Sequence, residues 1–320
     1  MLPATCGSSA YSSAVLADSP WAYWRLNEPS GTVAFDCSGY GRDATYQGGV
    51  TLGSGGQGVG FPSAATAPVF DGSTGYVLLP AIPTSSFGGP LFASFSIETW
   101  FESSSFTNNV RIFDLSHGTE ADWIVLFFGS ASTQAYILLD AGTNHYVFAT
   151  AGPNLSLGAW YHVVLTQSAY AIAGGSSYFY SVSFYINGLQ AATWTGSVSG
   201  YSDVARTVGY LGKSLHSPSD AFFSGTLAEA VRGNLAGGPL AGSWGFLALV
   251  IFALASGFFL TSFARLLVRC PFSCFPVSSL YAQAIYNYSL SAAQVSGHYL
   301  AGSTQLNVPP PSPPPPPLPR

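Results

Sequence analysis

The feature that most constrains the fold is a series of short segments in which apolar and polar residues alternate, divided by Gly, Ser, Asn and Pro. Alternation of this kind is clear in Ser94–Phe101 (SFSIETWF) and in Trp160–Thr166 (WYHVVLT). A period of two is typical of strands with one buried face. Asn187-Gly188, between two such segments, is a strong hairpin signal. The chain is therefore predicted to be all-β, an antiparallel sandwich of two sheets.

Composition agrees with this prediction and excludes two classes of protein. The chain has 36 glycines, 15% aromatic residues and 48% hydrophobic residues, which is enough apolar material to exclude a disordered chain. Only nine Lys and Arg stand against fourteen Asp and Glu, and no basic run occurs. Nucleic-acid binding would require such a run, so it is excluded.

Six sequence blocks follow one another at regular intervals across the chain. They are Val15–Glu28, Gly31–Tyr46, Val69–Val77, Phe95–Trp100, Trp160–Thr166 and Phe184–Gly188. Together they resemble the laminin-G-like (concanavalin A-like) domain family, although Ala44 stands where glycine is usual. The resemblance implies that the sandwich is a jelly roll.

The closing signature of that family is split in this chain. Phe223–Ala230 (FSGTLAEA) resembles its first part and Ala284–Gly302 resembles the rest, although Ala228 replaces the usual aspartate. The 53 residues Val231–Gln283 stand between the two parts. We therefore predict a jelly-roll domain of residues 11–230 plus 284–302, after a leader or fragment start at 1–10.

Two interpretations of the 231–283 insertion are open. It begins with valine and ends with glutamine, whose codons fit the usual intron boundaries, so a translated intron in the gene model is the favoured interpretation. The alternative is a transmembrane segment at 245–264, a run of 20 residues without a charge that is followed by Arg265 and Arg269. A single span would place 284–302 across the bilayer from the sheet that it should complete.

The last segment, 303–320, is predicted to be a proline-rich linker. Pro309–Arg320 (PPPSPPPPPLPR) favours a polyproline II conformation. It resembles the hydroxyproline-rich spacers of algal and plant cell-wall proteins. Met1–Ala17 lacks the basic start and apolar core of a signal peptide. We expect an extracellular or cell-wall location, as part of a longer secreted protein, with membrane association only if 245–264 is genuine protein.

The cysteines and sequons fit a secreted chain. Cys6 and Cys37 lie in the predicted domain and form a disulfide candidate, the alternative being two isolated small hydrophobic residues. The other pair, Cys270-Pro-Phe-Ser-Cys274, is a weak zinc motif. Asn154-Leu-Ser and Asn287-Tyr-Ser are N-glycosylation candidates.

The resemblance also implies calcium as a cofactor, with glycans or extracellular matrix proteins as partners. Calcium needs six to eight oxygen ligands, several of them carboxylates. Asp71, Glu120 and Asp122 are the candidate ligands. For each of them alone, a solvated turn is the simpler interpretation, and Asp71 is also expected to set a turn.

Several other conspicuous residues have structural explanations. Four tryptophans, Trp21, Trp24, Trp100 and Trp160, are predicted to lie in the core. Asp36 is expected to set a turn. A lone strand histidine such as His162 is expected to pack or to lie on the surface.

The predicted function is that of a noncatalytic extracellular recognition module that binds glycans or matrix components. One alternative is a glycoside hydrolase of the same fold, which needs two carboxylates flanking the scissile bond. Glu98 and Glu102 are the nearest pair, but they would lie roughly 13 Å apart in a regular strand, and only a bulge would bring them together. A single-pass membrane-anchored receptor is the other alternative. No serine-hydrolase motif supports further catalysis.

Overall fold

The computed structural model of the protein describes most of the jelly-roll domain. The described residues are 4–6, 9–53, 67–83, 94–106, 109–115, 124–128, 133–141, 144–149, 154–171, 177–199, 205–228 and 283–306. They belong to one compact unit, Met1–Arg232 with Ser279–Arg320, and a second unit, Gly233–Ser278, lies outside the described residues.

The described strands form two antiparallel sheets, which confirms the predicted sandwich. Sheet A has the order β14-β13-β12-β7-β16-β5-β4, and β17 lies beside both β7 and β1. Its strands are β1 (Ala22–Trp24), β4 (Val50–Thr51), β5 (Val69–Asp71), β7 (Phe95–Ser103), β12 (Trp160–Ala171), β13 (Ser177–Ile186), β14 (Leu189–Ser199), β16 (Ser224–Ala228) and β17 (Gln283–Tyr286). Asn187 and Gly188 both adopt positive φ between β13 and β14, as the predicted hairpin requires.

Sheet B has the order β11-β10-β9-β8-β15-β6-β3-β2. Its strands are β2 (Val33–Ala34), β3 (Ala44–Gln47), β6 (Tyr76–Leu79), β8 (Val110–Asp114), β9 (Ile124–Phe128), β10 (Ala135–Ala141), β11 (Asn144–Ala149) and β15 (Gly209–Leu211). The strands β8, β9 and β10 are joined as consecutive antiparallel neighbours.

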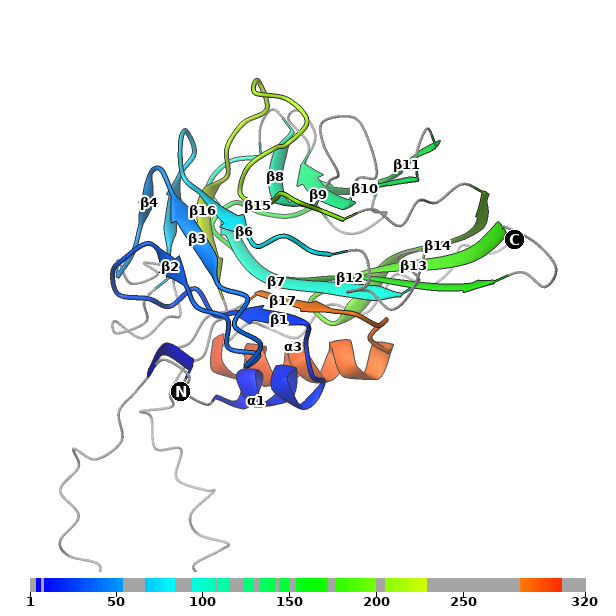
Figure 1. Ribbon diagram of the computed structural model, residues 1–320, viewed down its shortest axis with the longest axis horizontal. Helices are drawn as coiled ribbons and strands as arrows, with labels where there is room; N and C mark the ends of the chain where they lie inside the picture. The colour runs from blue at the N-terminus through cyan, green and yellow to red at the C-terminus, as the bar shows by residue number, and fades with distance from the viewer. Residues whose placement is uncertain are drawn as a thin grey trace, which may run out of the picture. The chain divides into compact units, whose positions relative to one another are not determined.

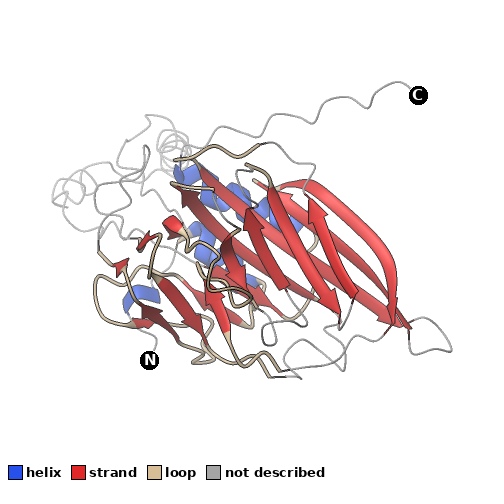
Figure 2. Ribbon diagram, turned by 90° about the horizontal axis from the view of Figure 1, so that it is seen from above, coloured by secondary structure: helices blue, strands red, loops and turns tan. Residues whose placement is uncertain are grey.

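The fold has a third layer, because two helices cover the outer face of sheet A (Figure 1). They are α1 (Ala10–Ala17) and α3 (Ala292–Leu306), and a short 3-10 helix, η1 (Ala4–Cys6), precedes them. Figure 2 shows the same arrangement from above, with the helices behind the strands. Sheet A therefore has an apolar cluster on each side. Phe95, Ile97 and Phe101 of β7 enter the sandwich core, whereas Trp100 packs under the helices.

The helices differ from expectation in two respects. The chain is predicted to be all-β, yet α3 forms after β17 and continues to Leu306, so residues 303–306 are helical and do not belong to the predicted linker. No helix was expected near the N-terminus, yet α1 forms there. It begins with a capping box in which Ser9 and Ser12 satisfy each other's backbone N–H groups. With eight residues, α1 is too short for its apolar positions to show a helical period.

The strands β16 and β17 occupy one continuous line along β7. Ala228, the last residue of β16, pairs with Trp100, and Gln283, the first residue of β17, pairs with the next residue, Thr99. The closing strand of the family is thus built from two parts that are separated by residues 229–282. Gln283, which is predicted to belong to the insertion, is buried in the sheet. Residues 231–282, with the apolar run 245–264, lie outside the described part of the chain, and no described helix is long and apolar enough to cross a membrane.

Candidate functional site

The densest group of titratable side chains surrounds Glu98, which we call the Glu98 cluster: Glu98, Tyr11, His162, Tyr286, His298 and Asp18. The carboxylate of Glu98 points from β7 toward the helices and is fully buried. Its Oε1 accepts hydrogen bonds from the Tyr11 hydroxyl and from His162 Nε2 at 2.9 Å. Its Oε2 accepts from His298 Nδ1 at 2.9 Å and from the Tyr286 hydroxyl at 3.1 Å.

The partners of Glu98 come from four elements that surround it. Tyr11 lies on α1, His162 on β12, Tyr286 on β17 and His298 on α3. His298 also uses its second nitrogen, with Nε2 3.0 Å from Oδ2 of Asp18, the residue that follows α1. One imidazole therefore connects both helices with the sheet.

The charges in the cluster follow from these contacts. Burial alone raises the pKa of Glu98, but the positive charge of His298 and the hydrogen bonds from both histidines lower it well below its usual range. Burial lowers the pKa of His298, but Glu98 and Asp18 outweigh burial and raise it. For His162 burial dominates, so its pKa is lowered and it stays neutral at pH 7. Its Nδ1 has no hydrogen-bond partner among the described residues. This agrees with a neutral ring whose proton is on Nε2, because Nδ1 then has no N–H group to donate.

The Glu98 cluster is closed to ligands. The carboxylate lies beneath α1 and α3, and four donors surround its two oxygens. The predicted glucanase pair is not brought together, because β7 pairs with β12 residue by residue from Phe95 to Glu102 without a bulge. Glu102 is only half-buried, and burial raises its pKa. The arrangement attaches the helices to sheet A. His162 is buried and packs against Trp100, as one of its two expected roles requires, and it also hydrogen-bonds Glu98.

A second group lies around Lys213, the only lysine of the sequence. We call Tyr76, Tyr210, Lys213 and Phe222 the aromatic–lysine cluster. The Lys213 ammonium lies 4.2 Å from the ring centroid of Tyr76, 4.8 Å from that of Tyr210 and 5.8 Å from that of Phe222. The two tyrosine rings meet edge to face at 5.3 Å. All four side chains are half-exposed.

The aromatic–lysine cluster is held by a buried ion pair beside it. Arg111 of β8 binds Asp220 at 3.1 Å, and Ser214 donates to the same carboxylate at 2.7 Å. The backbone N–H of Leu215 donates to Asp114 of β8 at 3.0 Å. These contacts fix the segment from Lys213 to Phe222 against sheet B.

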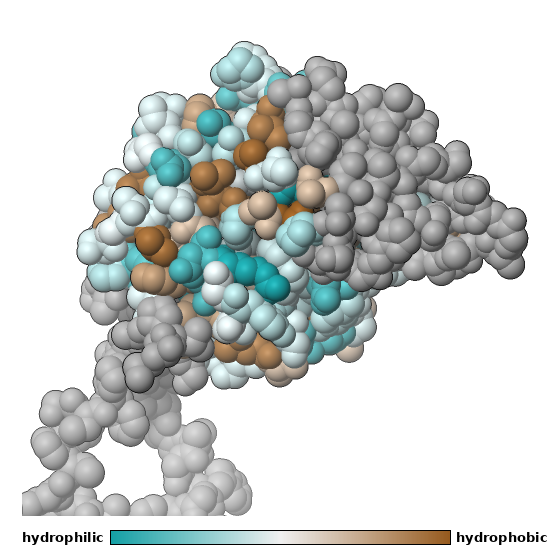
Figure 3. Space-filling view, in the orientation of Figure 1, coloured by the Kyte–Doolittle hydropathy of each residue, from teal (hydrophilic) through white to brown (hydrophobic). Residues whose placement is uncertain are grey.

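The aromatic surface continues along the same sheet. Phe127 of β9 stacks on Tyr136 of β10 at 5.4 Å, and the Arg111 guanidinium lies 4.7 Å from the Phe127 ring. Phe127 and Tyr136 are both half-exposed. On the face of the molecule seen in Figure 3, the coloured residues form small hydrophobic areas separated by hydrophilic ones.

Of the predicted calcium ligands, only Asp71 is described. Its carboxylate accepts hydrogen bonds from the backbone N–H groups of Ser73, Thr74 and Gly75 and from the hydroxyls of Ser73 and Thr74. These bonds lower its pKa, and they use the oxygens that a metal would need. The expected turn is confirmed. Glu120 and Asp122 lie outside the described residues. Among the residues that are described, no three His, Cys, Asp or Glu side chains are grouped so that they could hold a metal.

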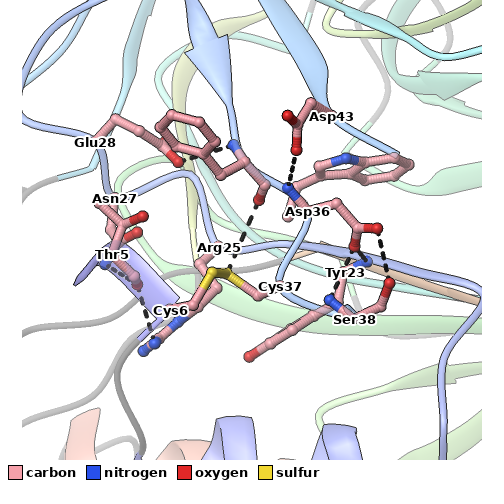
Figure 4. Close-up of a disulfide and its surroundings, with 12 residues drawn as sticks. Thr5, Cys6, Tyr23, Arg25, Asn27, Glu28, Asp36, Cys37, Ser38 and Asp43 are labelled. Atoms are coloured by element: carbon pink, nitrogen blue, oxygen red, sulfur yellow. Dashed lines mark hydrogen bonds between the residues drawn. A yellow bond between two sulfur atoms is a disulfide. The ribbon is translucent and has the colours of Figure 1, made fainter. Parts of the chain in front are cut away.

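The structure also places the predicted disulfide, the glycosylation sequons and the core tryptophans. Cys6 and Cys37 form the expected disulfide, with their Cα atoms 5.4 Å apart (Figure 4). Asn154 and Asn287 are exposed, as glycosylation requires, although glycosylation itself stays a prediction. The core placement of the four tryptophans Trp21, Trp24, Trp100 and Trp160 is confirmed. Cys270 and Cys274 lie outside the described part.

Sequence reasoning missed most of both clusters. Tyr11 and His298 stand 87 and 200 residues from Glu98, so no local spacing connects them. Lys213 did carry a signal, because a single lysine in 320 residues is unusual, but its aromatic neighbours come from separate strands.

Comparison with known proteins identifies the fold. A laminin G family model, described as the concanavalin A-like lectin/glucanases superfamily, matches residues 71–231. No curated protein matches the sequence.

Solved structures with the same fold include two toxin domains. The binding domain of botulinum neurotoxin serotype D/C VPI 5993 is 12% identical with a TM-score of 0.50, over 89% of this chain and 53% of that one. The receptor binding domain of the botulinum neurotoxin C/D mosaic serotype is 11% identical with a TM-score of 0.50, over 88% and 51%. This chain thus spans about half the length of those structures. A sialidase of Trypanosoma rangeli is 14% identical with a TM-score of 0.46, over 87% and 32%.

Proposed function

Because the chain belongs to the concanavalin A-like lectin/glucanases superfamily, we propose that it is a noncatalytic glycan-recognition module. The proposal includes an extracellular or cell-wall location within a longer secreted protein. This fold carries both lectins and hydrolases, so the choice between them depends on the side chains.

The observation that carries the proposal is the aromatic–lysine cluster. Glycans present flat apolar ring faces edged with hydroxyl groups, and half-exposed tyrosine rings offer both an apolar surface and a polar tip. Tyr76 and Tyr210 stand on adjacent strands of a sheet, and cation–π contacts hold the Lys213 ammonium above them. Such a surface needs little ordering when a ligand binds.

Hydrogen-bonding groups surround these rings, as glycan binding requires. Lys213 can donate to sugar hydroxyls, and it makes no ion pair with any described carboxylate. Arg111 and Asp220 beside it are already paired. The ligand would therefore pack on the exposed parts of the rings that Lys213 does not cover, and bond to the lysine and the tyrosine hydroxyls.

The hydrolase alternative receives no comparable support. Glu98 is enclosed in its own cluster, and Glu102 lies four residues along the same regular strand. Neither carboxylate belongs to the aromatic–lysine cluster. We therefore propose binding without hydrolysis.

The test is binding of the full chain to immobilised cellulose, xylan, mannan, chitin, pectin and arabinogalactan. Tyr210→Ala and Tyr76→Ala should each weaken binding to the recognised polysaccharide by about tenfold, the equivalent of roughly 1.4 kcal/mol. Leu300→Ala, at an exposed position on α3, is the matched control and should bind like the unmodified chain.

Two further readings complete the experiment. No new reducing ends should appear during incubation, and their appearance would favour the hydrolase. Binding with and without EDTA tests the calcium prediction. Failure to bind any of the six polysaccharides would refute the proposed site, as would binding by both tyrosine variants that equals binding by the unmodified chain.

A further inference from the structure

The turn that connects β2 to β3 is held by an unusually complete set of hydrogen bonds. Asp36 Oδ1 accepts from the N–H groups of Tyr23 and Ser38 at 3.0 and 2.9 Å. Its Oδ2 accepts from the N–H of Arg42 at 2.9 Å and from the Ser38 hydroxyl at 2.7 Å. The N–H of Asp36 in turn donates to Asp43 Oδ1 at 2.8 Å (Figure 4). One buried carboxylate therefore fixes both arms of the turn.

Covalent and side-chain contacts add to this support. Cys37 of the turn is bonded to Cys6, and the indole Nε1 of Trp24 donates to the Arg42 carbonyl at 2.7 Å. Gly39 and Gly41 have φ angles of +92° and +71°, which side-chain-bearing residues rarely adopt. The turn is therefore anchored on both sides of residue 40, at Cys37 and at Arg42.

This anchored turn displays Tyr40, which is 64% exposed, the highest value among the exposed large hydrophobic residues of the described chain. The Arg42 guanidinium lies between two rings, 4.5 Å from the centroid of Tyr40 and 4.3 Å from that of Trp21, and donates to the Trp21 carbonyl. The stack holds Tyr40 in place although most of its surface faces solvent.

The polar groups beside Tyr40 are suited to hydroxyl groups. Asp43 is exposed, and its second oxygen, Oδ2, accepts no hydrogen bond from a described residue. Arg42 is half-exposed and has five N–H donors in its guanidinium group. The guanidinium donor lies against the Tyr40 ring, the carboxylate acceptor stands on the same turn three residues along the chain, and their charges cancel.

We propose that Tyr40, Arg42 and Asp43 form a second ligand site, which takes a neutral sugar ring stacked on Tyr40, its hydroxyls bonded by Arg42 and Asp43. The patch is one ring wide, whereas a stable protein interface buries about 800 Å² on each partner. A single sugar is therefore the occupant that fits. The proposal shares its ligand class with the proposed function but none of its residues.

The site is separate from the aromatic–lysine cluster. Asp43 precedes β3, whereas Tyr76 pairs with Gln47 at the other end of that strand. Substitutions at Tyr40 and at Tyr210 can therefore be compared in one protein, each as the control for the other.

The experiment is saturation-transfer difference NMR on the full chain with the methyl glycosides of glucose, galactose, mannose and xylose. At least one should bind with a dissociation constant on the order of 1 mM, as expected for one sugar ring. Tyr40→Ala should weaken this binding about tenfold, and Asp43→Asn should weaken it less. Tyr40→Phe, which keeps the ring, should bind within about twofold of the unmodified chain.

The outcomes separate the two sites. If Tyr210→Ala abolishes glycoside binding and Tyr40→Ala does not, the second site is refuted and the proposed function stands. If Tyr40→Ala alone abolishes it, the second site is supported irrespective of the aromatic–lysine cluster. If no glycoside binds, the inference is wrong. It is also wrong if Tyr40→Ala leaves glycoside binding unchanged and instead abolishes binding of a protein partner. Because Tyr40 is exposed, its variants should fold, and unchanged tryptophan fluorescence would verify this.

Discussion

The Glu98 cluster and the aromatic–lysine cluster both place tyrosines around a charged group, but the charge is buried in the first and half-exposed in the second. In the Glu98 cluster, tyrosines and histidines surround a fully buried charge and satisfy both of its oxygens. In the aromatic–lysine cluster, tyrosines surround a half-exposed charge that has no ionic partner among the described residues.

The difference shows which titratable group is available for recognition. A buried charge with every hydrogen bond made inside the protein stabilises the fold, and breaking such an arrangement is costly. A half-exposed charge above aromatic rings contributes little to stability but retains its capacity to bond a ligand. The strongly shifted pKa of Glu98 therefore marks a structural site, although shifted pKa values are also common at active sites.

The largest expected effect is the loss of the Glu98 carboxylate. Glu98→Ala removes the acceptor for four donors and leaves the His298 charge poorly compensated, which should lower the free energy of unfolding by about 3–5 kcal/mol. Urea denaturation measures it. Glu102→Ala, on the same strand and half-buried, is the matched control and should cost no more than about 1 kcal/mol. Similar losses in both variants would contradict the distinct role of Glu98.

The two histidines should give the Glu98 cluster opposite responses to pH. The pKa of His298 is raised in the fold, so its contribution to stability is present below the ordinary histidine pKa and is lost as pH rises through the raised value. The pKa of His162 is lowered, so the fold requires its neutral form and loses stability as pH falls below the ordinary value.

Unfolding measured from pH 5.5 to 9 separates these responses. His298→Asn, which keeps a donor near Nδ1, should flatten the alkaline side of the stability profile. His162→Gln, which keeps a donor near Nε2, should flatten the acidic side. If both variants change the same side of the profile, the assigned charges are wrong.

Neither cluster contains a residue from the segment 229–282, which separates β16 from β17, although Tyr286 and His298 follow it. Because Ala228 and Gln283 pair with adjacent residues of β7, a chain that joins them directly should close the sheet with a change in stability of less than about 1 kcal/mol. Both the Glu98 ion pair and glycan binding should persist. A shortened chain that fails to fold would show that the insertion is needed.

Sequencing of the transcript across Gly225–Leu290 tests the origin of the insertion. A spliced message that lacks the codons for Val231–Gln283 would support the intron interpretation. A message that retains them, with an insertion that the fold requires, would favour the membrane alternative for 245–264.

The sequence predicts the sandwich well because its signals are local. Alternation in β7 and β12, the Asn187-Gly188 turn and the Asp71 turn each depend on neighbouring residues, and all are confirmed. The Cys6–Cys37 disulfide was predicted because both cysteines lie in the domain of a chain expected to be secreted, and it is present.

Both clusters, in contrast, depend on contacts between distant segments. His162 lies 64 residues from Glu98, and sequence spacing alone cannot distinguish a buried ligand of a carboxylate from a surface histidine. The helix α1 escaped prediction for a related reason: its eight residues show no period, and packing of Tyr11 and Val15 on sheet A stabilises it.

The smallest expected effect on stability, at Lys213, sharpens the comparison most. Lys213→Met keeps an apolar chain of similar length above Tyr76 and Tyr210 but removes the charge, so the free energy of unfolding should change by less than about 1 kcal/mol. Binding to the recognised polysaccharide should nevertheless fall by about tenfold, because the ammonium donors are lost. Glu98→Ala predicts the reverse, a large loss of stability with unchanged affinity in the fraction that remains folded. A Lys213→Met protein that binds normally but unfolds much more readily would assign the aromatic–lysine cluster to the fold, like the Glu98 cluster, and would leave the glycan site to be sought elsewhere on the molecule.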